Sequence, residues 1–179
     1  MADCNPEIIA EKYGDLVYKI CMTRLHSFDR SSVADACQTV FLNYMDYTST
    51  GRGFKDEGHE RAWFIRASIN CCTNIYKKGK YRSQNEESAD ISEITVSVDE
   101  DFEGDSVYAL LAVLPEKIRY AMYLFYVEEY STEEIAKILK TSGAGIRMRL
   151  KRGREILRDK LEDSSFLIEN NEGGVADVR

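Results

Sequence analysis

Hydrophobic side chains recur along most of the chain at the three-to-four-residue period of amphipathic helices, not at the two-residue period of strands. In the first half this period predicts three helices. The first begins at an Asn5-Pro6 cap, and the third covers about residues 60–78. Residues 25–32 and 48–58 are the expected connections. The three apolar stripes are Ile9, Tyr13, Leu16, Val17, Ile20 and Cys21; Val33, Ala36, Cys37, Val40, Phe41 and Tyr44; and Trp63, Phe64, Ala67, Cys71, Asn74 and Ile75.

The helical period is lost near residue 82, where Ser, Asn, Asp and Glu dominate, and it resumes at Val107. We therefore expect an all-α protein with two small helical domains, residues 1–82 and 105–163, joined by a flexible acidic linker over residues 83–104. Residues 164–179 are expected to form a disordered tail. In the second domain, Pro115 begins a helix with one apolar side, formed by Ile118, Met122, Phe125 and Tyr126.

The second domain ends in the pattern of a helix-turn-helix. Ser131 and Glu134 have the spacing of a capping box at the start of a short apolar helix. Lys140 and Thr141 are predicted to form the turn, and Ser142 to cap the next helix. The residues of that helix expected to face the core are Ile146, Leu150, Gly153, Leu157 and Leu161.

The outer face of this last helix is cationic. At about 100° per residue, the side opposite Ile146 is centred on Met148 and Lys151, with arginines on both flanks. Such a helix can enter a major groove with its first residues at base edges and its cations on the phosphates. A solvated basic face is the alternative, but the capped helix and tight turn favour groove binding. The candidate duplex-binding residues are Ser142, Arg147, Met148, Arg149, Lys151, Arg152 and Arg154.

The net charge of −7 hides a strong division of charge along the chain. Residues 137–160 contain nine basic and two acidic residues, and residues 61–82 contain six basic residues and no acidic ones. Residues 86–105 contain nine acidic residues and no basic ones. Two positive segments on either side of a negative connector are compatible with nucleic-acid binding despite the acidic average.

The third predicted helix carries a polar stripe opposite its core face. Cations, an amide and a hydroxyl on one stripe can hold a nucleic-acid backbone and discriminate a base edge. A solvated face is the alternative, which the absence of acidic residues in this segment disfavours. In the preceding loop, Phe54 could stack on an unpaired base, although a single loop aromatic is more often a packing anchor. The residues of the stripe are Arg66, Asn70, Thr73, Lys77 and Lys78.

Metal, cofactor, membrane and catalytic functions find little support. Five cysteines without repeated C-x-x-C spacing and only two histidines predict no metal site, and we expect no cofactor. The sequence has no apolar run of membrane-spanning length and no signal-peptide pattern at Met1, so we expect a cytoplasmic protein without membrane insertion. Paired carboxylates, a nucleophile triad and a phosphate-binding glycine loop are absent from the predicted ordered segments, which argues against an enzyme.

Five segments, taken in order, resemble the sigma-70 family of bacterial RNA polymerase sigma factors, specifically the small extracytoplasmic-function (ECF) group. The resemblance covers about residues 7–161. One departure is the recognition helix, where Gly145 and Met148 stand in place of the family's Thr and Ser. The segments are Asp35-Ala-Cys-Gln-Thr-Val-Phe41, Arg61-Ala-Trp-Phe-Ile-Arg-Ala-Ser-Ile-Asn70, Leu114-Pro-Glu, Tyr130-Ser-Thr-Glu-Glu-Ile-Ala-Lys-Ile-Leu139 and the run from Ser142 to Arg154.

The resemblance implies that the chain binds core RNA polymerase, directs it to promoters and assists promoter melting. Asp35, Gln38 and Phe41 would bind the polymerase clamp. Phe54 and Asn70 would hold a flipped-out base of the melted minus-ten element, and the basic helix would read the minus-thirty-five element as duplex. Members of this group are commonly held inactive by an anti-sigma factor, which is therefore a candidate partner. A stand-alone helix-turn-helix regulator remains the alternative, and a small nuclease is the least supported function.

Overall fold

The protein is described by a computed structural model over residues 6–25, 30–85 and 105–172. Within these ranges the regular elements are seven α-helices, so the all-α prediction is confirmed. The predicted linker, apart from its first three residues, 83–85, and the last seven residues of the chain lie outside the described ranges. The helices are α1 (Pro6–Leu25), α2 (Arg30–Ser49), α3 (Glu57–Asn85), α4 (Asp105–Ala112), α5 (Glu116–Tyr126), α6 (Thr132–Ile138) and α7 (Gly143–Glu172).

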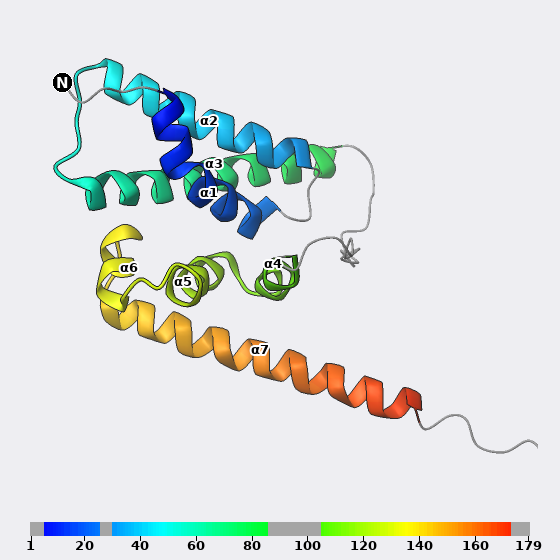
Figure 1. Ribbon diagram of the computed structural model, residues 1–179. Coiled ribbons are helices and arrows are strands. Elements are labelled where there is room, and N and C mark those ends of the chain that lie inside the picture. Colours follow the sequence, from blue (N-terminus) through cyan, green and yellow to red (C-terminus); the bar gives the residue numbers. More distant parts are fainter. Residues whose placement is uncertain (1–5, 26–29, 86–104, 173–179) are drawn as a thin grey trace, which may run out of the picture.

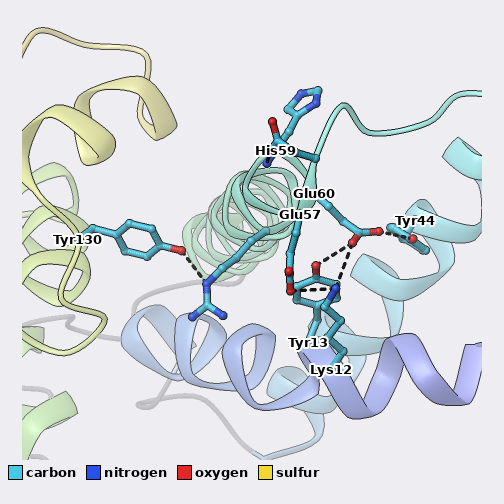
Figure 2. A network of polar contacts seen from close by, with 9 residues as sticks. Lys12, Tyr13, Tyr44, Glu57, His59, Glu60 and Tyr130 are labelled. Atoms are coloured by element: carbon cyan, nitrogen blue, oxygen red, sulfur yellow. Dashed lines mark hydrogen bonds and ion pairs between the residues drawn. The ribbon is translucent and has the colours of Figure 1, made fainter.

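Helices α1, α2 and α3 form a bundle in which each helix packs on the other two (Figure 1). Its centre is aromatic: the ring of Phe64 stacks on Tyr13 and on Tyr44, with centroid distances of 4.4 and 4.8 Å. Both tyrosine hydroxyls donate to the Glu60 carboxylate, at 2.7 and 2.6 Å (Figure 2). Because buried hydroxyl groups need a partner, Glu60 ties the start of α3 to α1 and α2.

Helix α3 is longer at both ends than the sequence predicted. Asp56 caps its start by accepting a 2.7 Å hydrogen bond from the backbone N–H of His59. The helix therefore begins at Glu57, inside the stretch expected to be a loop, and it continues past Lys78 to Asn85.

The inward side of α3 is also rotated relative to the prediction. Asn74, expected to face the core, is exposed. Trp63, Ala67 and Ile75 are only half-buried. Small polar and apolar residues occur on neighbouring sides of this helix, so the sequence is compatible with more than one inward side. Packing against α1 and α2 determines which side is buried. The fully buried residues of α3 are Phe64, Ile65, Ser68 and Cys72.

Helices α4, α5 and α6 lie between the α1–α3 bundle and the long α7 (Figure 1). Helix α5 contacts α1 on one side and α7 on another, so it has buried residues around most of its circumference. The single apolar side predicted for α5 is therefore wrong, and Tyr126, expected inside, is 52 % exposed. Its buried residues are Arg119, Tyr120, Ala121, Met122, Tyr123 and Leu124.

Helix α7 begins as predicted and ends later. Ile146 and Leu150 are buried, but Leu161, expected in the core, is 56 % exposed. The helix runs to Glu172, so the prediction of a disordered tail from residue 164 is wrong up to that point. No proline or glycine interrupts the sequence between Arg154 and Glu172. No helix in the described ranges combines the length and apolarity needed to cross a membrane.

Candidate nucleic-acid interface

The predicted helix-turn-helix is present. The Ser131 side chain accepts from the backbone N–H of Glu134 at 3.3 Å, and the Glu134 carboxylate accepts from the backbone N–H of Ser131 at 2.9 Å. This confirms the capping box. Hydrogen bonds from the side chain and backbone of Ser131 hold the pKa of the Glu134 carboxyl below its usual value. The box therefore contributes its stability above the ordinary glutamate pKa and loses it as acid protonates Glu134.

The turn between α6 and α7 is tight and its ends are fixed. Lys140 has a φ of 50°, in the left-handed region, and the backbone N–H of Thr141 bonds back to the carbonyl of Ala136 at 2.9 Å. Ser142 caps α7 by accepting from the backbone N–H of Gly145 at 3.1 Å. A Cβ on Gly145 would lie 3.2 Å from that same Ser142 oxygen, so the first turn of α7 is compact and presents backbone more than side chains.

The cationic face of α7 is directed to solvent. Six of the seven predicted duplex-binding residues are exposed, and Met148, at 73 %, is the most exposed large apolar residue of the described chain. Arg149 is half-buried. The exposed residues are Ser142, Arg147, Met148, Lys151, Arg152 and Arg154.

The ion pairs on this face are solvent-exposed and weak. Arg147 lies 3.3 Å from Glu133, and Arg152 lies 3.5 Å from Glu155. Such exposed pairs contribute about 0–1 kcal/mol, so a phosphate can displace either carboxylate. Within the described ranges, the structure shows no ion pair for Arg149 or Lys151. These cations are available to a polyanion.

A cavity of about 530 Å³ opens between α2, α3 and the turn before α7. It brings together three of the predicted α3 residues, Arg66, Asn70 and Lys78. Amides, cations and an indole around one hollow match the chemistry that holds an unpaired base beside its phosphate. The full lining is Thr39, Asn43, Trp63, Arg66, Ala67, Asn70, Cys71, Asn74, Ile75, Lys78 and Lys140.

Four polar residues of this lining were not predicted. Thr39 and Asn43 are four positions apart on α2, and Asn74 follows Asn70 by the same step, so helical spacing could have grouped them. Lys140 comes from the other half of the chain, and no local pattern places it here.

Two predicted residues of α3 and the loop aromatic lie outside the lining of this cavity. The hydroxyl of Thr73 donates to Glu116 of α5 at 2.6 Å, and Lys77 is exposed on α3. Phe54 is packed among aromatic rings, with centroids 5.2 Å from Tyr47 and 5.8 Å from Tyr44. In this structure Phe54 is therefore a packing anchor, which was the alternative to stacking on an unpaired base.

The predicted polymerase-binding residues lie on α2. Asp35 and Gln38 are exposed, whereas Phe41 is half-buried with its ring 5.6 Å from Phe64. Leu42, which the sequence prediction missed, is 62 % exposed on the same helix. Leu42 lies four positions after Gln38, so the two side chains are neighbours on one face of α2. In the described ranges, no cluster of His, Cys, Asp and Glu is arranged to hold a metal ion.

Comparison with known proteins gives a consistent set of similarities. The model of the family "Sigma-70, region 4" matches residues 104–157, which include the helix-turn-helix. The chain is 26 % identical over 155 residues to RNA polymerase sigma factor SigZ of Bacillus subtilis (strain 168), covering 84 % of this chain and 85 % of that protein. It is 27 % identical over 170 residues to the ECF RNA polymerase sigma factor SigW of the same organism, covering 87 % and 88 %.

Two solved structures have a similar fold. One is CnrH in complex with the cytosolic domain of CnrY, with a TM-score of 0.61 and 17 % identity over 88 % of each chain. The other is the sigma factor RpoE in complex with the anti-sigma factor NepR from Bartonella quintana, with a TM-score of 0.64 and 14 % identity over 87 % of this chain and 98 % of that one. At these identities the two matches support the arrangement of helices alone.

Proposed function

We propose that this chain is a sigma factor of the sigma-70 family, in its ECF group, and that it binds core RNA polymerase, directs it to specific promoters and assists their melting. The observation that best supports this function is the helix-turn-helix inside the region 4 match, with the cationic face of α7 open to solvent. Sigma factors are not enzymes, and we propose no catalytic activity and no cofactor for this chain.

The second half of the chain would read the minus-thirty-five element as duplex. With α7 in the major groove, Arg147, Arg149, Lys151, Arg152 and Arg154 would reach phosphates or base edges on both sides of the helix. Ser142 and Met148 would face the groove. Since the first turn of α7 carries two glycines, the readout would depend on backbone contacts and DNA shape as well as on side chains.

The first half would hold the melted minus-ten element. The cavity with Arg66, Asn70 and Lys78 in its lining would receive an unpaired base, while Thr73 and Lys77 would contact the backbone. Phe54 would need to leave its aromatic cluster to stack on that base.

The polymerase would bind the exposed face of α2 that carries Asp35 and Gln38, with Phe41 at its edge. Residues 83–104 would link a polymerase-binding domain, residues 1–82, to a duplex-binding domain, residues 105–163. Because core polymerase and promoter DNA are its partners, we place the protein in the cytoplasm. An anti-sigma factor is a further candidate partner, since one structure of similar fold is a complex with such a factor.

The experiment that tests this function is co-purification with core RNA polymerase. We expect the full chain to be retained by immobilised core enzyme, and Asp35→Ala/Gln38→Ala to weaken retention at least severalfold. Glu11→Ala, an exposed carboxylate on α1, is the matched control and should be retained as the wild type is. A chain that binds duplex DNA but is not retained by core enzyme would instead be a stand-alone regulator.

A further inference from the structure

Four cysteine thiols gather where α1, α2 and α3 meet, and the proposed function uses none of them. Cys21 of α1 and Cys72 of α3 are fully buried, whereas Cys37 of α2 and Cys71 of α3 are half-buried. The Cys21 thiol is in hydrogen-bonding contact with the sulfurs of both Cys37 and Cys72. The Cys71 thiol donates to the carbonyl of Ala36, the residue before Cys37, at 3.7 Å. The three helices therefore bring their thiols into one cluster.

The thiols of this cluster differ in reactivity and in access to solvent. The hydrogen bond from Cys21 lowers the pKa of Cys37 below its ordinary value, because it stabilises the thiolate. The same bond raises the pKa of Cys21. Burial raises the pKa of Cys71. Since the thiolate is the form that attacks an oxidant, Cys37 is the described cysteine that combines thiolate character with access to solvent.

Cys21 lies where a second thiol is needed to complete such a site. It is 0 % exposed and contacts the Cys37 sulfur, the atom that an oxidant would modify. The two cysteines belong to α1 and α2, which pack directly on each other. An accessible, low-pKa thiol beside a second thiol is the usual arrangement of a redox-sensing cysteine and its resolving cysteine. In the cytoplasm, where we place the protein, disulfides of this kind are transient and sense redox state.

We propose that Cys37 is a peroxide-reactive modification site and that Cys21 resolves it to a disulfide between α1 and α2. The Cys37 thiolate attacks one oxygen of hydrogen peroxide, the O–O bond breaks, and the leaving hydroxide takes up the proton that Cys37 released. The Cys21 sulfur then attacks the sulfur of the resulting sulfenic acid, the S–O bond breaks, and the leaving hydroxide takes the Cys21 proton. The two thiols lose two electrons and two protons in total, and one peroxide becomes two waters.

The disulfide acts on the face of α2 that is proposed to bind polymerase. Cys37 precedes Gln38 and lies one helical turn before Phe41. An S–S bond is about 2.05 Å long, far shorter than a contact between unbonded sulfurs, so α1 and α2 shift when it forms. Ala36 and Val40 are 0 % exposed, and a closely packed core transmits such a shift to the rest of α2. Oxidation thereby weakens polymerase binding, a consequence that rests on the proposed function, whereas the thiol chemistry does not.

The test oxidises the full chain with hydrogen peroxide and maps the product by tryptic digestion and mass spectrometry. Trypsin places Cys21, Cys37 and the adjacent Cys71 and Cys72 on three different peptides, because lysines and arginines separate them in the sequence. We expect a disulfide that joins the Cys21 peptide to the Cys37 peptide. Helix content by circular dichroism should be unchanged.

Single variants assign the two roles. With Cys21→Ala the sulfenic acid of Cys37 has no resolving thiol, so dimedone, a sulfenic-acid reagent, should label Cys37 after peroxide treatment. Cys37→Ser should form no disulfide. Cys71→Ser, at the other half-buried cysteine, is the matched control and should oxidise as the wild type does. Cys4 lies outside the described residues, and Cys4→Ser should also oxidise normally.

Retention by immobilised core polymerase measures the consequence, with the peroxide removed before mixing. The oxidised wild-type chain should be retained at least severalfold less than the reduced chain, and dithiothreitol should restore its retention. Cys37→Ser should be retained equally with and without prior peroxide treatment.

The proposal is overturned if peroxide yields no disulfide, if it joins a different pair of cysteines, or if the oxidised chain is retained as well as the reduced one. Should Cys21→Ala lose helix content, mapping of the wild-type chain and of Cys37→Ser still identifies the thiol pair. The mapping contains no polymerase. A reduced chain that core polymerase fails to retain would instead contradict the proposed function and leave the mapped disulfide unaffected.

Discussion

Arg149 is the half-buried member of the cationic face of α7, and the structure shows no ion pair for it within the described ranges. We expect Arg149→Ala to weaken binding of minus-thirty-five duplex while leaving retention by core polymerase unchanged. A base contact would cost about 1–3 kcal/mol and relax specificity at one position. A phosphate contact would instead reduce the salt slope by about 0.9. Gel-shift titrations at several salt concentrations distinguish the two.

Arg158 is the matched control for this substitution. It is on the same helix but lies near Asp159 and Glu162, at 3.6 and 3.7 Å. Arg158→Ala should bind the duplex as the wild type does. Equal loss of duplex binding and polymerase binding in Arg149→Ala would show that this residue supports the fold rather than the DNA contact.

Single residues could be predicted from the sequence where their role depends on near neighbours. Ser131, Glu134 and Ser142 cap helices through residues three positions away, and the structure has all three caps as predicted. Asn74 was placed wrongly because its exposure depends on how α3 is rotated against α1 and α2. Phe54 packs against aromatic rings of α2 and α3. The sequence of its own loop gives no indication of these contacts.

At the scale of helices, the contact between α5 and α7 depends on Gly153. A Cβ at this position would lie 2.7 Å from Sδ and 2.8 Å from Cγ of Met122, and 3.0 Å from Cγ2 of Ile118. We expect Gly153→Val to lower the free energy of unfolding by about 1–3 kcal/mol, because the added groups overpack the interface. Denaturant titration followed by circular dichroism measures the change.

Ala144→Val is the control for the β-branched side chain, since Ala144 is exposed on the same helix. It should cost no more than about 0.7 kcal/mol, the difference in helix propensity. If Gly153→Val is as stable as this control, Met122 has room to move and the close approach does not define the packing of the two helices.

Helices that pack on one side were predicted better than the helix that packs on several. The apolar stripe of α2 matches its buried residues closely, because α2 packs mainly on the neighbouring helices α1 and α3. Helix α5 lies between the α1–α3 bundle and α7, so nearly every side of it is covered, including that of Arg119. One apolar stripe in the sequence cannot identify all the buried residues of a helix that packs against other helices on two sides.

At the scale of the whole molecule, the two halves share one hydrophobic core cluster and several polar contacts. The division of charge in the sequence indicated two positive surfaces but not that carboxylates of one half would lie on the other. These contacts link residues far apart in the chain, such as Thr23 with Arg119, so no local pattern predicts them. The structure adds to the sequence prediction that the two halves pack against each other.

The most direct measurement is transcription in vitro by core polymerase on genomic promoter fragments, with and without the purified chain. The account predicts transcripts from a specific subset of promoters only when the chain is added. It also predicts that Asn70→Ala still recruits polymerase but yields less melted DNA by permanganate footprinting. If the added chain produces no specific transcript from any fragment, including the DNA upstream of its own coding sequence, the central claim is contradicted.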